Sequence, residues 1–256
     1  MKIGSITGYV DIAQLALYAF WIFFAGLIFY LRREDKREGY PLEPDRTGRV
    51  KVEGWPSVPK PKTFQLHEGG TYLAPHAETD LRPIRAIPSG PSVGAPLIPT
   101  GNPMIDAVGP ASYALRANHP DVTIDGEPMI VPVRATSGGY TVAGNDPDPR
   151  GMNVYGADRE LAGTVRELWI DRAEPQIRYL ELDTTGGRRV LLPINFTKIN
   201  GTARRINVRS ILASQFATVP TLSSPDQITR REEDQIMAYY SSGNLYATAA
   251  RAEPLL

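Results

Sequence analysis

The chain has 256 residues, 28 basic and 28 acidic side chains, and no cysteine. The balanced charge gives no reason to expect nucleic acid as a partner, and the lack of cysteine excludes disulfides, thiolate nucleophiles and sulfur-ligated metal sites. The part that follows an N-terminal apolar segment is long enough for one sizeable domain.

The apolar segment covers residues 12–31, a run of twenty residues without a charge. As a helix, this run would be roughly 30 Å long, which matches the hydrocarbon thickness of a bilayer. A removable signal peptide is the alternative, but such peptides have a shorter apolar core and a small-residue cleavage site. Arg32 and Arg33 follow the run, whereas Lys2 alone precedes it. We therefore expect one transmembrane helix, with residues 1–11 outside and the rest in the cytoplasm.

Three small residues, Ala16, Ala19 and Gly26, fall on one face of this helix. Small side chains allow another membrane helix to approach closely, so this face is a candidate for helix packing. The alternative is that alanine and glycine are simply common in membrane helices.

Residues 32–110 are rich in proline, which resists helices and central strands, so regular structure should be sparse there. Apolar residues such as Trp55, Phe64 and Tyr72 lie between the prolines. This composition favours a segment that docks on a partner surface, and a disordered linker is the alternative.

Residues 111–256 are predicted to form a mainly β domain. Runs typical of strands cover residues 163–171, 177–183, 189–193 and 205–209, with Gly186-Gly187 as a hairpin turn between the second and third runs. A small twisted sheet or partly closed barrel, with its core at about residues 151–220, is the expected result.

A helix is predicted at about residues 229–242, near the end of the chain. Thr229 and Glu232 have the spacing of a capping box, and Gly243 is expected to end the helix.

Titratable groups concentrate in the turn between the first two predicted strands, where Asp171, Glu174 and Arg178 lie beside bulky apolar residues. A carboxylate that is partly removed from water there could relay protons near neutral pH. The alternative is a solvated turn with a surface ion pair of little energetic value. The histidines, His67, His76 and His119, are scattered singly and predict no metal site, and no nucleophile with a base suggests an enzyme.

Several segments in order resemble the H subunit of the photosynthetic reaction centre of purple bacteria. The sequences that carry the resemblance are LYAFWIFFAGLI (residues 17–28), REGYPLE (37–43), PKPKTF (59–64), PTGNPM (99–104), GPAS (109–112) and EED (232–234).

The resemblance implies one transmembrane helix and a cytoplasmic, mostly β domain that contains a PRC barrel. It implies the L and M subunits and membrane lipids as partners, in the bacterial inner (chromatophore) membrane, with a cytochrome subunit and a light-harvesting antenna as optional companions. Those partners would hold the bacteriochlorophylls, bacteriopheophytins, quinones, non-haem iron and any carotenoid, and this chain would bind none of them through its own ligands. It would act as an accessory subunit that stabilises the core, shields the quinones and helps to deliver protons to the secondary quinone.

The resemblance also places the proton pathway on Asp171 and Glu174, with Arg178 as their electrostatic partner. Some members have a surface histidine pair as the proton entry, which this sequence lacks, so Asp125, Glu127 or His119 would replace it. The alternative to the whole assignment is a membrane-anchored PRC-barrel adaptor protein unrelated to photosynthesis.

Overall fold

The computed structural model describes residues 11–42, 52–67, 69–76, 80, 82–92 and 94–252. The chain divides into two compact units, Met1–Thr79 and Asp80–Leu256. Most of the predicted segment 1–11 lies outside the described residues.

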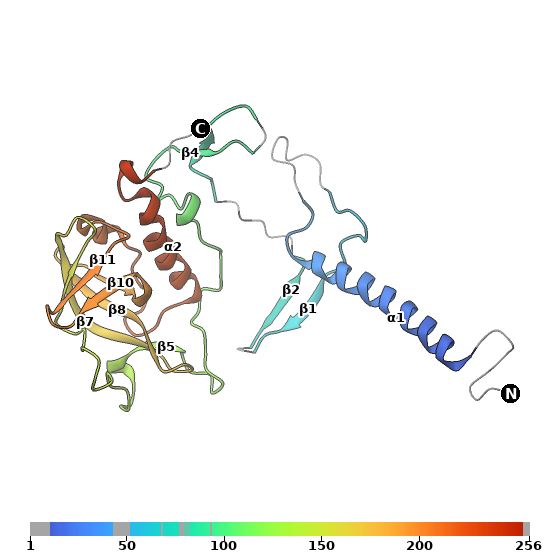
Figure 1. Ribbon diagram of the computed structural model, residues 1–256, viewed down its shortest axis with the longest axis horizontal. Coiled ribbons are helices and arrows are strands. Elements are labelled where there is room, and N and C mark those ends of the chain that lie inside the picture. The colour runs from blue at the N-terminus through green and yellow to red at the C-terminus, as the bar shows by residue number, and fades with distance from the viewer. Residues whose placement is uncertain are drawn as a thin grey trace. The chain divides into compact units, whose positions relative to one another are not determined.

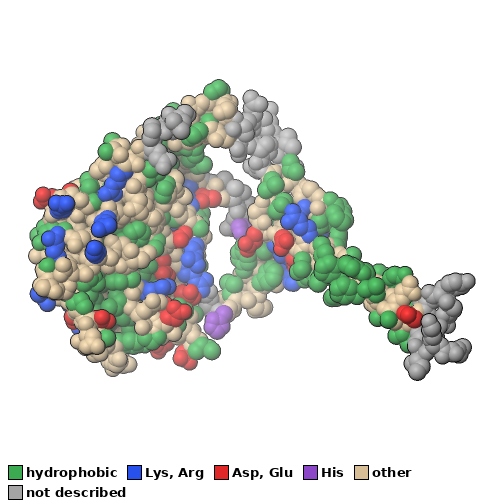
Figure 2. All heavy atoms as spheres, viewed as in Figure 1, with side chains coloured by type: hydrophobic (Ala, Val, Ile, Leu, Met, Phe, Trp, Pro, Cys, Tyr) green, Lys and Arg blue, Asp and Glu red, His purple; other side chains and the backbone are tan. Residues whose placement is uncertain are grey.

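The first unit begins with helix α1 (Ile12–Glu34), which confirms the predicted helix and extends it beyond residue 31. Asp11 caps it by accepting a hydrogen bond from the Gln14 backbone N–H at 2.7 Å. A short 3₁₀ turn, η1 (Asp35–Arg37), continues the helix. Together they form one candidate membrane span with a mean hydropathy of 2.1. Figure 2 shows hydrophobic side chains covering this helix, and none of its described residues is buried.

The three small residues on α1 all remain exposed. A Cβ atom built on Gly26 would meet no described atom within 4 Å. Ala16, Ala19 and Gly26 therefore leave an open face on the helix, and its use in packing stays a prediction.

The first unit also contains a β-hairpin, made of β1 (Lys62–Gln65) and β2 (Thr71–Ala74). Arg37 fixes this hairpin to the end of α1, because its guanidinium donates to the Lys60 carbonyl at 3.0 Å and the Ala74 carbonyl at 2.9 Å. Among the described residues of this proline-rich region, regular structure consists of short elements, of which this hairpin is one.

The second unit is built on a seven-stranded sheet, in which the strands run in the order β10-β11-β6-β7-β8-β9 and β5 pairs with β7 (Figure 1). The strands are β5 (Ile130–Pro132), β6 (Asn153–Tyr155), β7 (Leu161–Asp171), β8 (Gln176–Thr184), β9 (Arg189–Pro193), β10 (Thr197–Asn200) and β11 (Arg205–Val208). A separate two-stranded sheet joins β3 (Ala86–Pro88) and β4 (Leu97–Pro99). The mainly β fold with a curled sheet is therefore confirmed.

The core of this unit lies between the sheet and helix α2 (Arg230–Tyr246). Strands β7 to β9 contribute Trp169, Leu180 and Leu192, and the helix contributes Ile236 and Tyr240, which are all buried. The Gly186-Gly187 turn joins β8 to β9 as predicted, with Gly187 at φ +76°. Strands β7, β8 and β9 were predictable because each contains a continuous run of apolar residues.

Helix α2 begins where the capping box predicts. The Thr229 side chain accepts from the Glu232 N–H at 3.2 Å, and the Glu232 carboxylate accepts from the Thr229 N–H at 2.9 Å. The predicted end at Ser242 is wrong, because the helix passes through Gly243 and continues to Tyr246. A Cβ on Gly243 would lie 2.3 Å from the Ser210 carbonyl oxygen. This glycine therefore permits a close approach between helix and chain and does not end the helix.

Candidate functional site

Asp171 lies at the start of the turn that joins β7 to β8. Its side chain is in the protein interior, and the residue is only 3% exposed. One carboxylate oxygen accepts from the backbone N–H groups of Ala173 at 2.9 Å and Glu174 at 3.2 Å, which fixes the turn. The other oxygen lies 3.5 Å from Nε of Arg178. The structure thus brings together two of the three predicted pathway residues.

Glu174 occupies the tip of the same turn, where it is exposed. Its carboxylate accepts a hydrogen bond from the Gln176 side chain at 3.1 Å. The expected removal of a carboxylate from water therefore applies to Asp171 and not to Glu174. The turn presents one carboxylate to solvent and holds the other inside.

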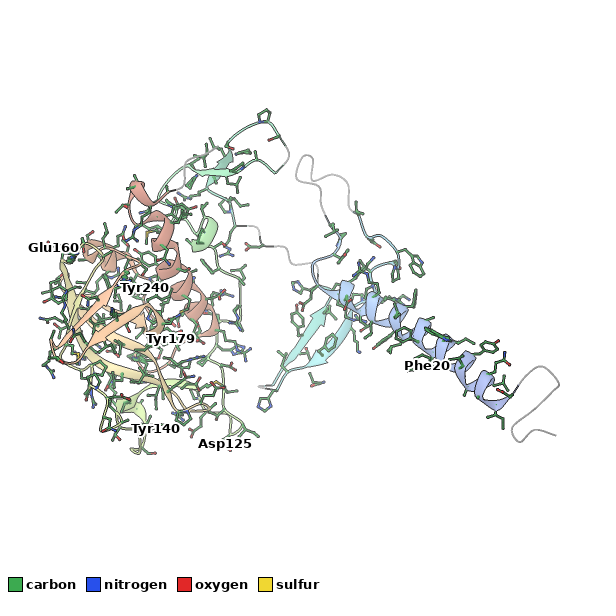
Figure 3. All side chains as sticks on the ribbon, viewed as in Figure 1. Phe20, Asp125, Tyr140, Glu160, Tyr179 and Tyr240 are labelled. Carbon is green, nitrogen blue, oxygen red and sulfur yellow. The ribbon has the colours of Figure 1, made fainter. Side chains whose placement is uncertain are left out.

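A second loop, residues 122–128, meets this turn. Arg172 forms an ion pair with Glu127, and its backbone N–H donates to the Met129 carbonyl at 3.0 Å. Asp125 lies at the exposed end of this loop, away from the sheet (Figure 3). Glu127, one of the three candidate entry residues, is thus joined by an ion pair to the turn with Asp171 and Glu174.

His119 lies beside the first turn of α2. It is exposed, its carbonyl accepts from the Arg230 N–H at 3.2 Å, and its Nδ1 lies 3.1 Å from the Pro120 carbonyl oxygen. Asp121, close by in sequence, pairs with the Arg230 guanidinium at 2.7 Å. Burial would raise the pKa of Asp121, but the hydrogen bond and the charge of Arg230 outweigh burial, so this pKa is lowered.

Glu233 on α2 belongs to the same group of residues, and sequence analysis did not select it. The Tyr179 hydroxyl donates to its carboxylate at 3.2 Å. Burial raises the pKa of Glu233, although the hydrogen bond from Tyr179 and the charge of Arg178 act in the opposite direction. Burial beside Glu233 also raises the pKa of Tyr179. Glu233 therefore favours its protonated form more than an exposed glutamate does.

These contacts define a polar cluster made of Asp171, Arg178, Tyr179 and Glu233. Arg178 joins the two carboxylates electrostatically, because it pairs with Asp171 and also acts on the charge of Glu233. Acidic and basic side chains lie intermixed on the side of the unit that carries α2 (Figure 2). The capping box fixes the start of α2 and so could have indicated the helix face that carries Glu233. The contact of Glu233 with Tyr179 on β8 depends on long-range packing, which the sequence does not display.

A second buried carboxylate, Glu181 on β8, has a different environment. It is 1% exposed, and it accepts from the Trp169 indole N–H and from Arg134, each at 2.8 Å. Nε of Arg189 lies 3.1 Å from its other oxygen. Arg166 lies 3.9 Å from the same oxygen as Arg189. With three cations and an indole donor around one carboxylate, this arrangement is suited to holding the sheet together.

Among the described residues, no group of three or more histidine or acidic side chains could hold a metal ion.

Two comparisons with known families agree with this architecture. Residues 4–135 match the family described as photosynthetic reaction centre, H-chain N-terminal region, and residues 144–214 match the PRC-barrel domain. The first match includes α1 and the proline-rich region, and the second includes strands β6 to β11. Because the first match alone covers more than half of the sequence, the chain belongs to the family of photosynthetic reaction centre H chains.

Proposed function

We propose that this chain covers the L and M subunits on the cytoplasmic side of the bacterial inner membrane, shields the quinone sites and helps to deliver protons to the secondary quinone. The observation that carries the proposal is the family match over residues 4–135. An adaptor unrelated to photosynthesis would need only an anchor and a barrel, whereas this match also includes the proline-rich region. Family membership implies association with the reaction-centre core, whose complex carries pigments and quinones.

The β1–β2 hairpin supports docking on partner subunits. Its apolar side chains, Phe64, Tyr72 and Leu73, remain more than a third exposed. A two-stranded hairpin is marginally stable by itself in water. Arg37 holds this one to the end of α1, but its apolar side chains stay exposed, so it is expected to pack against a further surface. The L and M subunits are the partners that the family provides.

The polar cluster supports the role in proton delivery. Reduction of a quinone to a quinol consumes protons at a site that is screened from water, so proton carriers must titrate near the working pH. Burial shifts the pKa of Glu233 upward, in the direction of neutral pH, and Asp171 lies in the same cluster, on the other side of Arg178. In the proposal, Asp125, Glu127 or His119 serves as the entry from solvent, and Glu174 and Asp171 carry the protons onward, with Arg178 as their electrostatic partner.

The test replaces Glu174 with glutamine in the purified complex. Glu174→Gln keeps the size and hydrogen-bonding capacity of the side chain but cannot carry a proton. We expect the proton-coupled second electron transfer to the secondary quinone to slow by about tenfold or more, as is typical when a proton carrier is removed. Primary charge separation should be unchanged, because it involves no proton. Flash absorption kinetics measure both steps.

Glu160→Gln is the matched control, because Glu160 is another exposed glutamate of the same unit (Figure 3). Its variant should transfer the second electron at the wild-type rate. Unchanged second-electron kinetics in Glu174→Gln would remove Glu174 from the pathway. A native complex without near-infrared absorption would overturn the photosynthetic role itself.

A further inference from the structure

We propose that residues 52–56, here named the Trp55 loop, form a second contact with the membrane, in which Trp55 lies among the lipid headgroups next to the end of α1. The proposal rests on the proposed role of α1 as a membrane span. It concerns the first unit alone and adds a lipid-binding surface to the anchor.

The first observation is the exposure of Trp55. Its side chain is 81% exposed, although its ring packs against Phe29 of α1 with ring centroids 5.3 Å apart. Phe29 lies within the candidate span, close to Tyr30 and to the exposed Arg32 and Arg33. The indole is thus continuous with the lipid-facing surface of the helix at the level where apolar residues give way to basic ones. Tryptophan prefers this zone of a bilayer, because its ring is apolar and its N–H can bond to headgroups or water.

The second observation is that a buried lysine holds the loop in place. Lys36 is 2% exposed, and its ammonium donates to the carbonyls of Glu53 and Pro56, the latter at 2.5 Å. The same ammonium lies 5.1 Å from the centre of the Tyr40 ring. Lys36 belongs to the turn that continues α1, so these bonds tie both sides of Trp55 directly to the end of the helix.

The third observation concerns the backbone of the loop. Gly54 has φ +65°, and a Cβ there would lie 3.4 Å from the Lys36 ammonium. Backbone bonds between Leu42 and Val52, at 2.8 and 3.0 Å, hold the first residue of the loop against the chain that follows η1. Leu42 and Val52 are each about half exposed, which extends the apolar surface around Trp55. A loop that is held at both ends, at Val52 and at Pro56, and presents its largest apolar side chain outward is suited to partial insertion into lipid.

Spin labelling of the native complex in membranes provides the test. This chain contains no cysteine, so Trp55→Cys introduces one label position, and the unmodified complex supplies the background from partner subunits. Collisions of the label with oxygen, which concentrates in lipid, are compared with collisions with a water-soluble nickel chelate. We expect an oxygen-to-nickel ratio at least about threefold above that of Ile124→Cys, a position that is 88% exposed in the second unit.

Labels at Phe20, Ile22 and Phe23 on α1 separate the two proposals. If these positions report lipid while position 55 reports water, the Trp55 loop is not a membrane contact and the anchor still stands. If none of the α1 labels reports lipid, the anchor fails as well. A label at position 55 that neither reagent reaches would mean that a partner subunit covers it, which also overturns the inference.

A second measurement keeps the indole in place. The full-length chain is inserted into vesicles of phosphatidylcholine that carries bromine near the headgroup, and emission is compared between the wild type and Trp55→Phe. We expect the emission that Trp55 contributes to be quenched by more than half relative to vesicles without bromine. Emission from Trp55 that bromine does not alter would overturn the inference.

Lys36→Met tests the role of the lysine, with Lys60→Met as its control at an exposed lysine of the same unit. Methionine cannot donate to the two carbonyls, so the label at position 55 should become more mobile and its oxygen-to-nickel ratio should fall toward that of Ile124. Lys60→Met should leave both unchanged. Equal spectra for the two variants would show that Lys36 does not position the loop.

Discussion

Trp169 and three arginines surround the carboxylate of Glu181, and this arrangement makes a prediction at the scale of one residue. Arg134, Arg166 and Arg189 all lie within 4 Å of it. Glu181→Ala would leave the buried indole N–H without an acceptor and the arginines without their shared anion. We expect it to lower the free energy of unfolding by about 3 kcal/mol, measured by urea titration of the full-length chain in detergent.

Asp183→Ala, on the same strand, is the control. It should lower the free energy of unfolding by less than about 1 kcal/mol, because Asp183 is about half exposed. Equal losses would contradict the structural role of Glu181.

Glu233 makes a prediction about pH. Its pKa is raised in the folded chain, so between the ordinary pKa of glutamate and this raised value the folded state binds more protons than the unfolded state. Stability must therefore decrease as the pH rises through this range, and it should remain at the lower level above it. Glu233→Gln removes this loss of stability. The melting temperature of the variant minus that of the wild type should therefore be larger at pH 8 than at pH 4. Thermal unfolding of the full-length chain at both values measures the difference. Glu160→Gln should show no such dependence, and a pH-independent effect of Glu233→Gln would contradict burial as the cause.

At the scale of elements, the sequence predicts long strands better than short ones, and contacts within a hairpin better than contacts between distant segments. Strands β7, β8 and β9 were predictable because each carries a run of apolar residues. Strands β5 and β6 have three residues each, which is too short to show an alternation of apolar and polar side chains. The proximity of Asp171 and Arg178 followed from the hairpin between two predicted strands. The position of Glu233 beside Tyr179 could not follow, since it requires α2 to pack on β8 across a long stretch of sequence.

Gly243 shows how packing overrides a local rule within an element. Alanine is favoured over glycine in a helix by about 1 kcal/mol, so helix propensity alone predicts that Gly243→Ala stabilises α2. A Cβ at this position would lie 2.3 Å from the Ser210 carbonyl oxygen and 2.5 Å from Cγ2 of Ile211. Such overpacking costs about 1–3 kcal/mol, and we expect a net loss of stability in urea titration. Asn244→Ala, at the exposed neighbouring position, should be neutral or slightly stabilising. A stabilising Gly243→Ala would show that the helix can move away without cost.

At the scale of the whole molecule, the two units differ in how much of their apolar surface they bury themselves. The second unit encloses a core around Trp169 and Tyr240, whereas the first unit leaves α1 and the β1–β2 hairpin exposed. We therefore expect lipid and partner subunits to cover the first unit, in line with membership of a family that associates with the reaction-centre core.

Limited proteolysis tests this dependence. Lys62 in β1 and Arg85 before β3 are exposed, so trypsin should cut the free full-length chain after both residues. In the native complex, the L and M subunits should cover the proline-rich region, and cleavage at both positions should slow by about tenfold or more, because a protease must wait for the covered segment to open. Mass spectrometry of the fragments over time measures both rates.

Arg204, exposed in the turn between β10 and β11, lies outside this region and serves as the internal reference within each digest. Equal cleavage of Lys62 and Arg85 in the free chain and in the complex, relative to Arg204, would mean that the proline-rich region is a linker and does not dock.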